Sequence, residues 1–141
     1  MEWTISPGAP GALKIEVAMD VLERFDAQEY HASVLLTPRY TRWETASESG
    51  QFPEIDPKVR DWVHLNSDFR SGGFLRASGA GLPRLTIKPD ASAPHRLTAL
   101  NTDYMHGARV LQALATPDHG LFSFEPGRHP YFSGTISVSL D

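Results

Sequence analysis

The chain has 141 residues, of which 40% are hydrophobic and 21% charged, so it can form one folded domain with its own core. It contains no cysteine, which excludes a disulfide framework, a thiolate metal site and a cysteine nucleophile. The formal net charge is −4 and the 13 basic residues are scattered, which disfavours nucleic acid as a partner. There is no visible secretory signal and no apolar run long enough to span a membrane. We therefore expect a single cytoplasmic domain over residues 1–141.

The N-terminal quarter of the chain predicts a β-hairpin. Residues 1–11 contain two prolines and two glycines, and we expect an irregular lead-in there. Apolar and polar residues alternate over 13–21, which is typical of a half-buried strand. The alternation resumes over 30–36 and stops at Pro38. Together the two runs predict an antiparallel hairpin over residues 12–37.

The middle of the chain predicts further short strands. Aromatic and β-branched residues over 40–43 suit a strand. Asp56-Pro57 could start a helix, but the apolar spacing over 56–66 also fits a strand, and the sequence leaves this choice open. Glycine-rich turns bracket a predicted strand at 74–77, and prolines bracket another at 84–88.

The last forty-five residues predict two parallel strands connected by a helix. Strands are expected at 96–100 and 121–125. Between them, residues 102–115 carry an apolar stripe at helical spacing, made by Tyr104, Ala108, Leu111 and Ala115. A turn after residue 125 then leads into a final strand over 135–140. The predicted fold class is therefore α+β and mostly β, a mainly antiparallel sandwich or open barrel of about eight short strands with one helix packed on it.

One candidate site follows from the predicted helix. Its N-terminus would present free N–H groups and lie beside the turn that follows residue 125. An anionic small molecule could then be held by Asn101, Thr102, His106, Arg128 and His129. In that reading His106 is the candidate acid–base residue. Ordinary helix capping and turn chemistry explain the same residues.

Aromatic residues provide a second candidate surface. Trp43, Phe52, Trp62 and Phe69 fall in or beside the irregular stretches, where they could contact a partner protein or plug the ends of the core. The final strand has no charged residue before Asp141. Edge strands are usually protected by charge or proline, so this strand is expected to be central in its sheet or paired with another chain.

The chemistry of the sequence favours a non-enzymatic interaction protein. The histidine spacing matches no metal site and no serine lies in a nucleophile motif, so we assign no catalytic residue, metal or cofactor. We expect a protein partner or self-association through a sheet edge and the aromatic loops. The alternative is a binding protein or minor enzyme for an anionic metabolite at the helix N-terminus. A hollow barrel holding an apolar ligand also stays open.

Overall fold

The computed structural model describes residues 1–56, 62–67, 73–102 and 107–140, and none of them is helical. No helix among them could therefore cross a membrane. The strands in chain order are β1 (Glu2–Pro7), β2 (Ala12–Val21), β3 (Phe25–Ala27), β4 (Tyr30–Leu36), β5 (Arg42–Thr45), β6 (Ser49–Gln51), β7 (Trp62–His64), β8 (Leu75–Ser78), β9 (Arg84–Pro89), β10 (Arg96–Thr102), β11 (Ala108–Ala115), β12 (Phe122–Phe124) and β13 (Gly127–Ser139).

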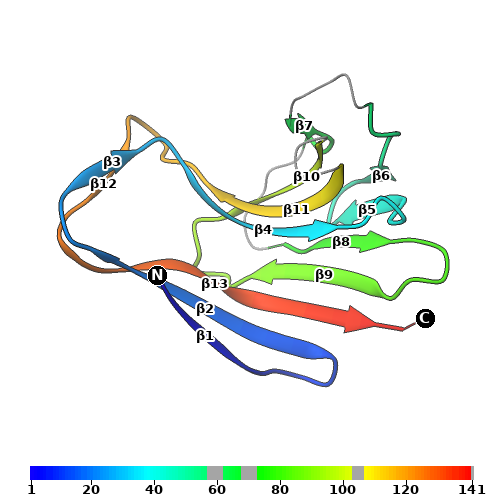
Figure 1. Cartoon of the computed structure of the whole chain (residues 1–141), viewed down its shortest axis with the longest axis horizontal. Helices are drawn as coiled ribbons and strands as arrows, with labels where there is room; N and C mark the ends of the chain where they lie inside the picture. Colours follow the sequence, from blue (N-terminus) through cyan, green and yellow to red (C-terminus); the bar gives the residue numbers. More distant parts are fainter. Residues whose placement is uncertain (57–61, 68–72, 103–106, 141) are drawn as a thin grey trace.

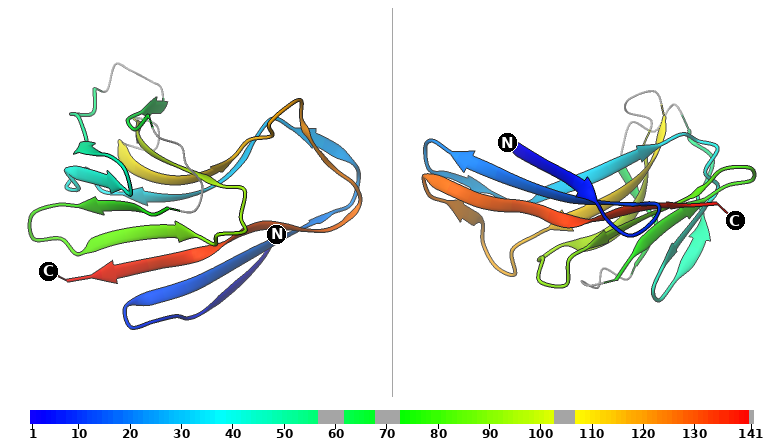
Figure 2. Two further views of the ribbon diagram at one scale, coloured as in Figure 1. Left: turned by 180° about the vertical axis from the view of Figure 1, so that it is seen from behind. Right: turned by 90° about the horizontal axis from the view of Figure 1, so that it is seen from below.

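The strands form three antiparallel sheets (Figure 1). The largest has seven strands in the order β1-β2-β13-β9-β8-β5-β6, and a second has four in the order β4-β11-β10-β7. Strands β3 and β12 pair as a separate ribbon, which Figure 2 shows at the end of the molecule opposite to β5 and β6. The architecture is thus a β-sandwich of two unequal sheets with a two-stranded extension.

Alternation along the strands gives the seven-stranded sheet one apolar and one polar face. Ile15 and Val17 of β2 lie opposite Gly134 and Phe132 of β13, and the apolar face continues to Ile87 of β9. The four-stranded sheet packs over this face on β8, β9 and β13. Residues of both sheets therefore share one core, which includes the fully buried Leu75, Ile87, Leu111 and Ala113.

The predicted helix at 102–115 is wrong. Residues 103–106 lie outside the described residues, but Ala108–Ala115 is strand β11, paired antiparallel with β10 and β4. The two strands predicted as a parallel pair, at 96–100 and 121–125, lie in different sheets, because β10 pairs with β11 and β7 whereas β12 pairs with β3. Residues 108–113 of this strand are buried whichever face they point to, so their sequence lacks a period of two. An apolar run of this kind also matches helical spacing, and periodicity cannot separate the two structures.

Three other expectations are corrected. The lead-in over 1–11 contains strand β1, which pairs with β2. The predicted hairpin over 12–37 is wrong, because β2 pairs with β1 and β13, whereas β4 belongs to the other sheet. The turn expected after residue 125 belongs largely to β13, which begins at Gly127. The uncharged final segment that was expected over 135–140 forms the end of β13, and β13 lies between β2 and β9, so the lack of charge there is explained by a central position.

The remaining strand predictions are close to the structure. The expected strands at 74–77, 84–88 and 96–100 correspond to β8, β9 and β10. The strand alternative for 56–66 matches β7 over its three residues, while residues 57–61 lie outside the described part of the chain. The segments at 74–77 and 84–88 carry β-branched or apolar residues bounded by glycine, proline or serine.

Strand β11 predicts which residue in this segment is most sensitive to truncation. Val110 is fully buried on the strand, although a helix with the predicted stripe would turn it away from the core. We expect Val110→Ala to lower the free energy of unfolding by about 2 kcal/mol in urea denaturation. Val138→Ala, at a valine that is 45% exposed, is the matched control and should cost less than about 0.5 kcal/mol. Equal effects of the two substitutions would contradict the strand assignment.

Candidate protein-interaction surface

The apolar face of the seven-stranded sheet extends beyond the part that the smaller sheet covers. Trp3 and Ile5 of β1 lie opposite the buried Val17 and Ile15 of β2, so they point to the same face as the core. Both are nevertheless 59% exposed. Leu13 of β2 and Val138 of β13 are on this face too and about half exposed. We call Trp3, Ile5, Leu13 and Val138 the β1 patch.

The β1 patch is bordered by an open sheet edge. Strand β1 is terminal in its sheet and has β2 as its only neighbour among the described strands (Figures 1 and 2). The N–H of Gly8 donates to the carbonyl of Ala12, so Gly8 and the even-numbered residues before it direct their backbone groups to β2. The backbone N–H and C=O groups of Trp3 and Ile5 therefore point outward. Pro7, which has no N–H, also falls on the outward side and costs the β1–β2 pair no hydrogen bond.

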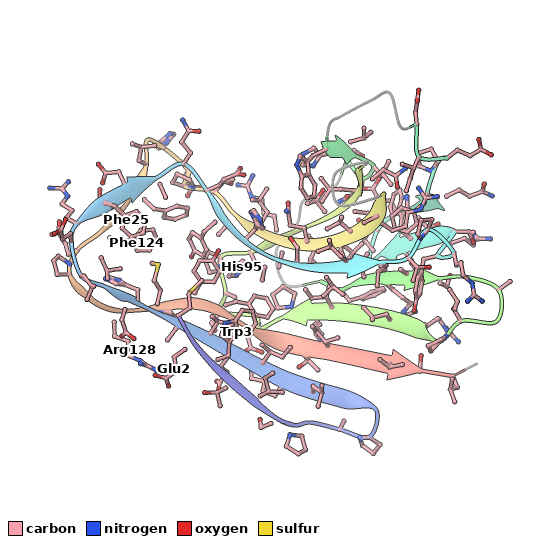
Figure 3. All side chains as sticks on the ribbon, in the orientation of Figure 1. Glu2, Trp3, Phe25, His95, Phe124 and Arg128 are labelled. Carbon is pink, nitrogen blue, oxygen red and sulfur yellow. The ribbon has the colours of Figure 1, made fainter. Side chains whose placement is uncertain are left out.

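The opposite face of the same strands is polar and internally paired. Arg128 of β13 donates to Glu2 at 2.8 Å and lies 3.7 Å from Asp20, and Figure 3 shows Glu2 and Arg128 side by side on the outside of the sheet. Arg128 lowers the pKa of Glu2 and Glu2 raises that of Arg128. Lys14 forms an ion pair with Asp90 and so connects β2 to the end of β9. The charges of this face thus tie strands together.

The structure does not assemble the anion site predicted from the sequence. Asn101 is buried in the four-stranded sheet, whereas Arg128 and His129 lie on β13 of the other sheet. His106 lies outside the described residues, as does the side chain of Thr102. Arg128 and His129 do line a pocket of about 430 Å³, but the guanidinium there already has its two carboxylate partners. Asn101 and Thr102, where the helix was expected to begin, belong to strand β10.

The aromatic residues predicted to bind a partner have different environments. Trp43 and Phe52 are 6% exposed and belong to the core. For these two residues, the alternative that they fill the end of the core is therefore correct. The guanidinium of the buried Arg109 lies over the Phe52 ring, and it donates to Asn101 Oδ1 at 2.6 Å. Trp62 of β7 is 40% exposed, and Phe69 lies outside the described residues.

Sequence reasoning missed Trp3 and Ile5. The signal was present, because Trp3, Ile5 and Pro7 alternate with three polar residues, as a half-buried strand requires. The two prolines and two glycines in residues 1–11 suggested an irregular segment instead. These residues occupy the turn between β1 and β2, apart from Pro7 at the end of β1.

An aromatic cluster joins the β3–β12 ribbon to the sandwich. Phe25 of β3 stacks on Phe124 of β12, and Tyr30 contacts Phe124 edge-on at 5.8 Å between ring centroids. His95 is 2% exposed and lies edge-on between Tyr30 and Phe132, at the boundary between ribbon and core (Figure 3). Burial lowers the pKa of His95 from its ordinary value of 6.5 more than the neighbouring backbone of Tyr131 raises it.

The surface is not assigned by similarity to other proteins. No protein-family model, curated protein or solved structure matches this chain. Within the part of the chain that the structure describes, no three His, Asp or Glu side chains lie close enough together to hold a metal ion. The open edge and the β1 patch are the surface features that could contact a partner.

The buried His95 predicts a loss of stability in weak acid. Because its pKa is lower in the folded chain, the unfolded chain takes up the proton first, and the free energy of unfolding falls as pH drops below about 6.5. We expect urea denaturation at pH 7 and pH 5 to show a smaller pH-dependent loss for His95→Phe than for the unmodified protein. His119→Gln, at an exposed histidine, is the control. An unchanged loss in His95→Phe would contradict this role of burial.

Proposed function

We propose that this protein is a non-enzymatic interaction protein that binds an extended protein segment along β1. The bound segment would add a strand to the seven-stranded sheet and pack its side chains beside Trp3 and Ile5 of the β1 patch. The observation that carries the proposal is that Trp3 and Ile5 are 59% exposed on the face that forms the core from the neighbouring strand β2 onward. Added strands gain affinity from backbone hydrogen bonds and specificity from alternate side chains, and β1 offers both.

The other sheet edges are less suited to this task. Strands β6 and β7, and β3 and β12 of the ribbon, have three residues each, and short edge strands are a common protection against pairing. The edge strand β4 is approached by β13, and the hydroxyl of Tyr131 donates to the carbonyl of His31. In contrast, β1 has six residues, and its one charge, on Glu2, is paired with Arg128. Strand addition is therefore most favourable at β1.

The proposal keeps the cytoplasmic location expected from the sequence. A chain without cysteine suits a reducing compartment. A protein partner is also favoured by the chemistry of the surface. Trp3 and Ile5 present apolar side chains beside their own outward backbone N–H and C=O groups, and a polypeptide can satisfy both together.

Site-specific photo-crosslinking in cells tests the proposal. A photoreactive benzoylphenylalanine in place of Trp3 should form an adduct with a protein chain, because position 3 lies on the exposed edge strand beside which the bound segment would pack. Mass spectrometry should map the adduct to one defined segment. A second substitution, Ile5→Lys, should abolish the adduct by placing a charge in the contact.

Leu22 provides the matched control position, because it is an apolar residue that is 88% exposed and lies outside the β1 patch. Photoreactive substitution there should give none of the adduct seen at position 3. If position 3 yields no adduct, or if positions 3 and 22 yield the same adducts, β1 is not an interaction edge.

A further inference from the structure

We propose that the segment bound by β1 is β1 of a second copy of this chain, with the two strands antiparallel and a two-fold axis passing beside Thr4. This inference rests on the proposed function, and it specifies the partner and the register. The resulting dimer has one continuous sheet that crosses the interface. A two-fold interface uses the same surface on both copies, so a single exposed edge is sufficient to build it.

The outward backbone groups determine the register. Trp3 and Ile5 carry outward N–H and C=O groups, because the Gly8–Ala12 hydrogen bond directs the backbone groups of the even-numbered residues to β2. With the axis at Thr4, Trp3 of each copy lies opposite Ile5 of the other, and each such pair exchanges both N–H···O=C hydrogen bonds. An axis at Ile5 would instead place Pro7, which has no N–H, opposite Trp3. The Thr4 register therefore satisfies both outward donors.

The side chains are complementary in the same register. On the apolar face, Trp3 of one copy packs beside Ile5 of the other, and each loses part of its contact with water. On the polar face, Thr4 meets its own copy, a favourable cross-strand pair. Glu2 faces Ser6 of the other copy, so no like charges are opposed, and its carboxylate keeps its partner Arg128. A partner strand carrying an acidic residue opposite Glu2 would be repelled.

The size of this contact indicates the strength of the dimer. Stable complexes typically bury about 800 Å² per partner. A six-residue strand with a few half-exposed apolar side chains provides less than that. We therefore expect a dissociation constant in the micromolar range, so that the proportions of monomer and dimer change with protein concentration.

The absence of cysteine in the sequence allows a direct test by single-cysteine crosslinking. In the proposed register the two Thr4 residues form a non-hydrogen-bonded pair with Cα atoms about 4.5 Å apart, within the range that a disulfide bridges. We expect Thr4→Cys to form a disulfide-linked dimer rapidly in mild oxidant at high protein concentration. Thr4 is exposed and its backbone already pairs with β2, so the substitution leaves the fold intact.

Ser6→Cys is the matched control on the same strand and face. In the Thr4 register the two Ser6 residues are about 14 Å apart along the strands, which is too far for a disulfide. Crosslinking of Thr4→Cys at least tenfold faster than that of Ser6→Cys supports the dimer. Equal rates, or faster crosslinking of Ser6→Cys, overturn it.

Sedimentation velocity of the unmodified protein and of Ile5→Lys is an independent test of the dimer. The unmodified protein should shift from monomer to dimer as its concentration rises, and Ile5→Lys should stay monomeric with an unchanged denaturation profile. A protein that is monomeric at several hundred micromolar, with no disulfide in Thr4→Cys, overturns the dimer. If position 3 then still photo-crosslinks to another protein, only this inference fails. If it yields no adduct, the proposed function fails as well.

Discussion

The structure depends on an apolar sheet face that is wider than the sheet packed against it. Alternation places every second side chain of each strand on the inner face of the sheet. This face continues from β5 through β13 and β2 to β1. The four-stranded sheet covers its centre, where Leu75, Ile87 and Leu111 are fully buried. At β1 the side chains of this face are exposed to solvent. The periodicity that builds the core thus also produces the interaction surface, and one physical cause accounts for both.

The sequence predicted this fold unevenly, and the errors have physical reasons. Strand β2 was recognisable because one of its faces is exposed to solvent, so that polar and apolar residues alternate along it with a period of two. In β11, Val110 and Leu111 point to opposite faces and are both fully buried, so the alternation disappears and helical spacing fits by chance. Strand pairing was not predictable locally either. Strand β2 pairs with β13, which follows it by more than a hundred residues, and no local pattern specifies such a partner.

The candidate surface was less predictable than the fold. The sequence favoured a sheet edge as the interaction site and considered the uncharged final strand, yet that segment belongs to the central β13 and the open edge is β1. Trp43 and Phe52 were expected near a partner because they flank irregular segments, but loops that cross the end of a sandwich also bury their aromatic residues. Exposure depends on how far the smaller sheet extends, and that extent is a property of the whole fold.

Residue-resolved amide hydrogen exchange of β1 at low and high protein concentration tests the central claim most directly. Thr4 and Ser6 donate to β2 and should be protected at both concentrations, because those hydrogen bonds belong to the folded monomer. Trp3 and Ile5 have outward N–H groups and should exchange rapidly in the dilute protein and become protected as it is concentrated. Rapid exchange of Trp3 and Ile5 at every concentration, with Thr4 and Ser6 still protected, would contradict the account of β1 as a self-pairing edge.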